Sequence, residues 1–161
     1  MKKFVILSLL FVISCKEQEF KKIYEMEIKY YWDIKNPEYE NIKVSEKLSN
    51  NNNLFIYDYV KLHNGIDTLI IKDNKVFLKN TNPKFISKKT FFINNKKIEI
   101  KKYFYTSGHP HSLMNFYINN EKGIIMSENG NGGNVEYSYK ENSEIINQIL
   151  IDKKFSLFEL K

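Results

Sequence analysis

His109 and His111 flank a proline in a loop between predicted strands, and no other stretch comes closer to a chemical site. Both imidazoles can reach one metal ion from such a loop. A third ligand would come from His63, or from a carboxylate such as Glu128 or Asp67. The sequence does not fix this third ligand, and exposed loops also tolerate histidines. We therefore name the three histidines as metal candidates, and we predict no metal and no other cofactor.

Covalent and acid–base catalysis have even less support. No serine lies in a nucleophile-elbow motif. The acidic residues are spread along predicted strand faces, without a close pair for acid–base work. We therefore predict that the protein is not an enzyme. A metal-dependent hydrolase that uses His109 and His111 is the remaining catalytic alternative.

The only cysteine, Cys15, follows an apolar stretch that begins directly after Lys2 and Lys3. This stretch is about ten residues long, roughly half of what a helix needs to span a bilayer. A positive start, a short apolar region and a small residue before the cleavage point are typical of a secretory signal peptide. The sequence therefore predicts export, and a lone thiol in an exported chain needs an explanation.

The residues Val12-Ile13-Ser14-Cys15 resemble the lipobox of bacterial lipoproteins. In that family the cysteine is acylated and the preceding peptide is removed, so the resemblance implies a lipid on Cys15 and membrane attachment. Several acyl chains anchor a protein stably. The next residue, Lys16, is not the aspartate that marks inner-membrane retention in many Gram-negative lipoproteins. The resemblance therefore implies the outer membrane, and it leaves the surface and the periplasmic face both open.

Two other places are candidate ligand contacts. Tyr31 and Trp32 point to opposite faces of a predicted strand, so an outward Tyr31 could stack on a sugar or a protein. The loop 127–134, which contains Gly130 and Asn131, could bind a ligand, because loops on rigid sheets carry binding sites. This loop is not a phosphate loop, since the lysine and hydroxyl that should follow are missing. The simpler alternatives are an ordinary surface tyrosine and a flexible connection.

Composition narrows the possible partners. All 25 basic residues are lysine, and the chain contains neither arginine nor alanine. The net charge of +6 suggests a polyanion, but the lysines are scattered and arginine, the usual reader of guanine, is absent. We therefore predict no nucleic-acid partner. The absence of arginine and alanine indicates an A+T-rich genome, whose codon usage also favours phenylalanine and tyrosine. The 15% aromatic content is therefore no evidence for a sugar-binding surface, and most of these rings must fill a core.

Period-two alternation and turn residues predict the elements that position these groups. One face of the segment 23–32 is apolar, which is typical of a half-buried strand. Asn and Asp accept the positive φ of tight hairpin turns. The sequence therefore predicts hairpins around Asp73-Asn74, Asn94-Asn95 and 119–123, and further strands at 54–62 and 135–139.

Helical signals are fewer. Asn36 followed by Pro37 is typical of a helix start and predicts a helix to about Leu48, although its apolar spacing is irregular. The segment 143–153 has a cap, an acidic first turn and a continuous apolar stripe, so it is the best predicted helix. We expect this helix to pack on the sheet, and residues 155–158 to form a last short strand.

These elements predict an α+β fold, with an antiparallel β-meander of roughly seven to nine strands and one C-terminal helix packed on it. We assign residues 1–14 to a cleaved signal peptide, 15–22 to a lipidated tether and 23–161 to a single α+β domain. The predicted function is a small envelope lipoprotein with a non-catalytic binding role. A surface-facing module for an unknown protein or glycan is the first hypothesis, and a periplasm-facing accessory or immunity protein is the alternative.

Overall fold

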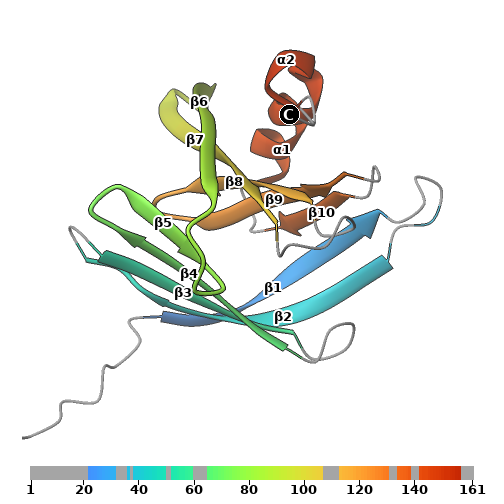
Figure 1. The fold of residues 1–161 in the computed structure, drawn as a ribbon. Helices are drawn as coiled ribbons and strands as arrows, with labels where there is room; N and C mark the ends of the chain where they lie inside the picture. The colour runs from blue at the N-terminus through green and yellow to red at the C-terminus, as the bar shows by residue number, and fades with distance from the viewer. Residues whose placement is uncertain are drawn as a thin grey trace, which may run out of the picture.

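The computed structural model describes residues 22–31, 36, 38–49, 52–59, 65–106, 113–130, 134–138 and 142–156. Ten strands form one antiparallel sheet, and two helices follow them (Figure 1). The strands are β1 Lys22–Tyr31, β2 Glu38–Lys47, β3 Asn52–Tyr59, β4 Gly65–Lys72, β5 Lys75–Leu78, β6 Lys84–Ile93, β7 Lys96–Tyr105, β8 Met114–Asn119, β9 Gly123–Asn129 and β10 Asn134–Ser138. The helices are α1 Asn142–Ile151 and α2 Lys153–Ser156.

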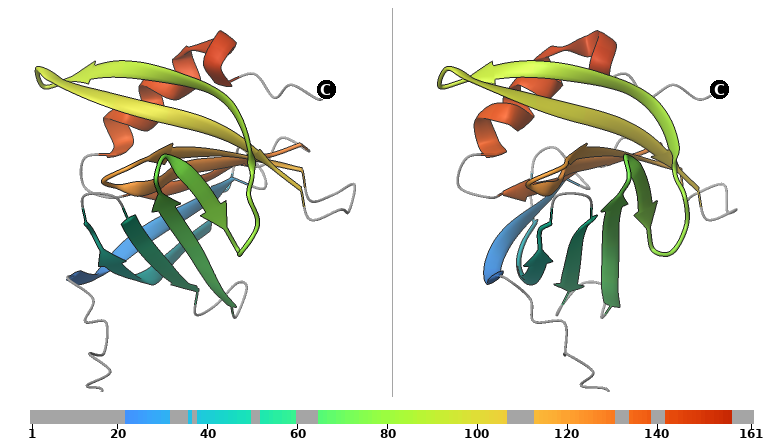
Figure 2. Two further views of the ribbon diagram at one scale, coloured as in Figure 1. Left: turned by 60° about the vertical axis from the view of Figure 1, so that its left-hand side comes forward. Right: turned by 90° about the vertical axis from the view of Figure 1, so that its left-hand side faces the viewer.

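The sheet is a nearly closed ring of strands. Its order is β5-β4-β3-β2-β1-β10-β9-β8-β7-β6, so all chain neighbours except β5 and β6 pair with each other. The first and last strands also pair, with Tyr30 opposite Val135. Strands β5 and β6 are therefore the two edges, yet only residues 79–83 connect them. Because such a connection spans at most about 20 Å, the sheet must curl until its two edges approach each other (Figure 2).

A main hydrophobic core fills the inside of this curl. Strand β1 contributes alternate side chains, since Met26, Ile28 and Tyr30 are buried there. They pack with side chains from both halves of the sheet, so the curl closes around one core. The other buried members are Ile42, Val44, Phe55, Tyr57, Tyr59, Leu69, Ile71, Val76, Leu78, Tyr103, Phe116, Ile118 and Ile124.

A second core lies between the helices and the outer side of strands β6 to β9. Ile145, Ile146 and Ile149 of α1 form its apolar stripe. Phe155 of α2 packs edge-to-face on Tyr117, with ring centroids 5.6 Å apart. The helices thus cover the side of this half of the sheet that faces away from β1 to β5 (Figure 2). As a result β8 and β9 are buried on both faces.

The predicted α+β fold is confirmed, and with ten strands the sheet is slightly larger than expected. Two of the predicted hairpin turns adopt positive φ at both central residues, for example 49° and 62° at Asp73 and Asn74. The predicted C-terminal helix is confirmed as α1, which ends at Ile151 before the short helix α2. A third two-residue turn with positive φ, at Lys79 and Asn80, was not predicted.

Two sequence predictions are wrong. Residues 38–47 form strand β2, not a helix, and burial alternates there with Ile42 and Val44 on the inner face. Pairing with β1 and β3 satisfies the backbone of this segment, so long-range pairing overrides the local cap signal. Phe155 and Ser156 belong to helix α2 and not to a last strand; residues 157–158 lie outside the described part of the chain.

Candidate functional site

The two edges of the curled sheet, β5 and β6, do not pair with each other, and we call the opening between them the seam. The seam begins at Pro83. After the turn at residues 79–80, Leu78 and Thr81 exchange both backbone hydrogen bonds, at 2.8 and 2.9 Å. In an antiparallel ladder the next hydrogen-bonded pair would join Val76 and Pro83. Proline has no N–H to donate, so the ladder cannot continue. The chain therefore separates from β5 at this point, and β6 starts on the far side of a gap.

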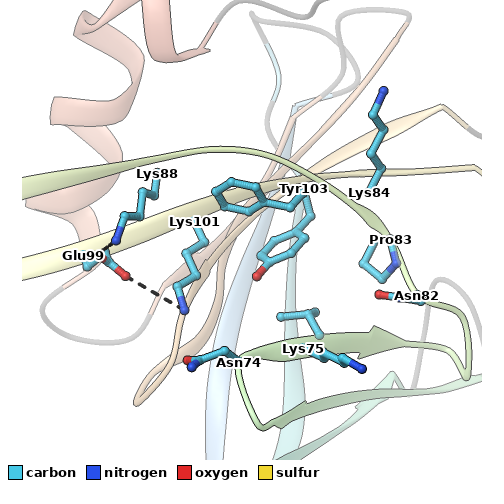
Figure 3. Close-up of a pocket in the computed structure, with 11 residues that line it drawn as sticks. Asn74, Lys75, Asn82, Pro83, Lys84, Lys88, Glu99, Lys101 and Tyr103 are labelled. Atoms are coloured by element: carbon cyan, nitrogen blue, oxygen red, sulfur yellow. Dashed lines mark hydrogen bonds and ion pairs between the residues drawn. The ribbon is translucent and has the colours of Figure 1, made fainter.

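This gap is a cleft of about 690 Å³ between the β4–β5 hairpin and the β6–β7 hairpin (Figure 3). We call it the seam cleft. Its volume lies in the range of small-molecule sites. The lining residues are Asn74, Lys75, Val76, Asn82, Pro83, Lys84, Phe85, Lys88, Glu99, Lys101 and Tyr103.

The seam cleft is strongly basic, because four lysines line it together with a single carboxylate. Glu99 accepts from Lys88 at 2.9 Å and lies 3.9 Å from the Lys101 ammonium. Lys84 turns its ammonium out of the cleft, and the ammonium groups of Lys75 and Lys101 lie toward opposite sides of it (Figure 3). Within the described part of the chain, Lys75 makes no ion pair. The positive charge of the cleft is therefore only partly neutralised.

Lys101 differs from the other cleft lysines in its burial. Its side chain is only 13% exposed. Its ammonium donates to the side-chain oxygen of Asn120 at 3.3 Å, and its carboxylate partner Glu99 is at the limit of an ion pair. A half-compensated lysine in such a place costs desolvation free energy. An anion in the cleft would recover part of that cost.

Two aromatic rings give the cleft an apolar wall. Phe85 packs edge-to-face on Tyr103, with ring centroids 5.6 Å apart. Phe85 remains 50% exposed, whereas Tyr103 is only 4% exposed. The Tyr103 hydroxyl points into the space beside Lys101 (Figure 3). Burial, and secondly the charge of Glu99, raise the pKa of Tyr103, so its hydroxyl stays protonated and can donate a hydrogen bond.

The chemistry of the seam cleft is that of binding. Its ammonium and phenol groups donate hydrogen bonds to an anion. Glu99 is the only carboxylate of the lining, and it pairs with Lys88. No serine, cysteine or histidine occurs among the described residues that line the cleft. The arrangement therefore favours recognition of a negatively charged group.

A second polar cluster lies buried beneath the helices. The Tyr117 hydroxyl donates to Glu128 at 2.7 Å, and Lys102, 3% exposed, donates to the backbone oxygen of Phe155 at 2.9 Å. The Lys102 ammonium also lies 5.4 Å from the centre of the Tyr117 ring. Burial raises the pKa of Glu128, and the bond from Tyr117 and the charge of Lys102 offset part of that rise. This cluster fixes α2 on the sheet.

Most of the predicted site residues cannot be compared with the structure. Tyr31 is the last residue of β1, and only its backbone is described. Gly130 is exposed after β9, and its N–H donates to the oxygen of Leu113 at 2.9 Å. Neither residue lines the seam cleft. The predicted residues Cys15, Trp32, His63, His109, His111 and Asn131 lie outside the described residues.

The metal hypothesis stays untested for the same reason. Of its proposed carboxylate ligands, Glu128 accepts from Tyr117, and Asp67 pairs with Lys79 at 2.9 Å. Within the described ranges no three His, Cys, Asp or Glu residues lie close enough to hold a metal ion. The three histidines are not among them.

Sequence reasoning missed the seam cleft. A local signal existed, since Pro83 follows a residue pair, Lys79-Asn80, that can form a tight turn. Nothing local, however, brings Lys101 of β7 into the same cleft as Lys75 of β5. That arrangement exists only because the ring closes between β1 and β10.

The fold and the cleft define a curled antiparallel sheet with a basic ligand cleft at its open seam. No protein-family model, no curated protein and no solved structure matches this chain. Neither described helix is long and apolar enough to cross a membrane.

Proposed function

We propose that this chain is a non-catalytic binding protein, held in the cell envelope by lipid on Cys15, and that its seam cleft binds an anionic ligand. One observation carries the proposal: four lysines and a single carboxylate line a cleft of about 690 Å³. The lipid anchor rests on the lipobox resemblance alone. It would place the binding domain beside a membrane.

The charges of Lys75 and Lys101 set the loss of affinity that their removal should cause. A unit charge 4 Å from an ammonium gains about 1 kcal/mol in bulk water and about 4 kcal/mol at an effective dielectric constant of 20. Lys75 is exposed and belongs near the first value, whereas the mostly buried Lys101 belongs nearer the second. Removing both charges should therefore weaken anion binding by tenfold or more, because about 1.4 kcal/mol corresponds to tenfold.

A charge-matched pair of variants tests this site. Lys75→Gln with Lys101→Gln removes two positive charges from the cleft. Lys43→Gln with Lys154→Gln removes two exposed charges on β2 and α2, outside it. Isothermal titration of the full chain in detergent with pyrophosphate, at low salt, should show at least tenfold weaker binding for the first pair only. Equal losses in both pairs, or no binding by the parent, would refute the proposed site.

The orientation of the protein is a separate question. The surface-facing module and the periplasmic accessory or immunity protein place the same domain on opposite sides of the outer membrane. Protease treatment of intact cells, with lysed cells as control, separates them. Loss of the protein from intact cells supports the surface module, and survival until lysis supports the periplasmic alternative.

A further inference from the structure

The edges of the seam are poor templates for an extended peptide. A peptide that adds a strand needs a regular row of free backbone groups. Strand β5 has only four residues, and the N–H and C=O of Leu78 are already hydrogen-bonded to Thr81. On the other edge, Pro83 has no N–H, and a register shift between Phe85 and Ser87 interrupts β6. The seam cleft is therefore built for a compact ligand.

The lining offers three kinds of contact within one small volume. Lys75 and Lys101 offer ammonium groups for an anion. Asn74 and the Tyr103 hydroxyl can exchange hydrogen bonds with neutral hydroxyl groups. The half-exposed ring of Phe85 offers an apolar face with a negative quadrupole, which suits the C–H face of a sugar ring. A simple inorganic anion would use only the first of these contacts.

We infer that the seam cleft binds an acidic saccharide, a sugar that carries a carboxylate or a phosphate group. The acidic group lies on the lysines, the sugar ring on Phe85, and the sugar hydroxyls on the amide and phenol groups. This inference deepens the proposed anion-binding function and rests on it. A cleft of about 690 Å³ has room for one or two sugar units.

Four probes separate the contributions. The full chain in detergent is titrated with glucuronate, glucose 6-phosphate, glucose and inorganic phosphate, and binding is followed by calorimetry or ligand NMR. At least one acidic sugar should bind tenfold or more tightly than both glucose and inorganic phosphate. The preferred acidic sugar shows whether the natural group is a carboxylate or a phosphate.

Variants assign the sugar contact to its residue. Phe85→Ala should weaken the preferred acidic sugar about tenfold and leave the affinity for inorganic phosphate within twofold. Phe92→Ala is the matched control, because Phe92 is 64% exposed on the same strand and does not line the cleft. It should change neither affinity.

The failures of the two proposals give different results. If inorganic phosphate binds as tightly as the acidic sugars and Phe85→Ala changes nothing, the saccharide is refuted and the anion site survives. If a blocked acidic hexapeptide binds more tightly than every sugar, the occupant is a peptide and the saccharide is refuted. If no anionic probe binds, both the saccharide and the anion site are refuted.

Discussion

Gly123, at the start of β9, has a backbone that only glycine adopts without strain, and its replacement by alanine tests the core beside it. Its φ of +75° lies in the left-handed region, which costs other residues about 1–2 kcal/mol. An added Cβ would lie well inside van der Waals contact with the Tyr57 hydroxyl, so Tyr57 must move. That hydroxyl accepts a hydrogen bond from the buried Ile124 N–H at 2.9 Å. Leaving this N–H unpaired costs about 1–3 kcal/mol.

Gly123→Ala should therefore lower the free energy of unfolding by about 2–5 kcal/mol. For a domain of this size 1 kcal/mol corresponds to about 2–4 °C, so the melting temperature should fall by about 10 °C. Urea and thermal unfolding followed by far-ultraviolet circular dichroism measure both quantities.

The companion variant Tyr57→Phe makes the explanation specific. Without the hydroxyl, the shortest clash of Gly123→Ala disappears. The backbone strain of about 1–2 kcal/mol and a close contact with the Phe55 ring at 3.1 Å remain in both backgrounds. The double-mutant cycle should thus give a coupling free energy of about 1 kcal/mol or more. Equal costs of Gly123→Ala in both backgrounds, or a cost below about 1 kcal/mol in the parent, would refute the reasoning.

Other predictions concern the seam, the buried carboxyl and the anchor. Pro83→Ala restores a backbone N–H opposite Val76, so the ladder can extend and narrow the cleft. Hydrogen exchange of the Val76 amide should slow, and pyrophosphate should bind more weakly. Unchanged values would contradict the explanation that Pro83 opens the seam. Because burial raises the pKa of Glu128 above its ordinary 4.5, the folded state binds this proton more readily than the unfolded state. The parent should lose stability relative to Glu128→Gln as the pH rises above that value, and urea titrations with equal differences at pH 4 and pH 7 would contradict this. Cys15→Ala should abolish labelling by radioactive fatty acid and leave an uncleaved precursor, whereas surviving label would exclude the lipid anchor.

The elements that the sequence predicted correctly are those with strong local signals. The alternation of Met26, Ile28 and Tyr30 placed one face of β1 in the core, and Asp73-Asn74 supplied the positive φ of a hairpin. The apolar stripe of α1 likewise identified a helix that covers the sheet. In each case a few adjacent residues determine both the element and its buried face.

The errors arise where distant strands decide the outcome. The cap-like start at Asn36 and Pro37 was local, but the two ladders on either side of β2 supply its backbone partners and make it a strand. The seam cleft depends on an even longer connection. Lys75 and Lys101 come to line the same cleft only after β1 pairs with β10 and the sheet curls, and no local pattern predicts that pairing.

The basic character of the seam has two possible causes, and Lys101 separates them. Sheet edges are commonly protected from pairing with other chains, and the seam edges carry four features that do this: exposed lysines, a bulge, a proline and a short strand. Lys84 and Lys88 on β6 therefore need no ligand to explain them. Lys101 lies on β7, which is paired on both sides, and its side chain is mostly buried, with the Asn120 amide oxygen at 3.3 Å and the Glu99 carboxylate at 3.9 Å. Edge protection gives no reason for a charge in that position, whereas an anion in the cleft does.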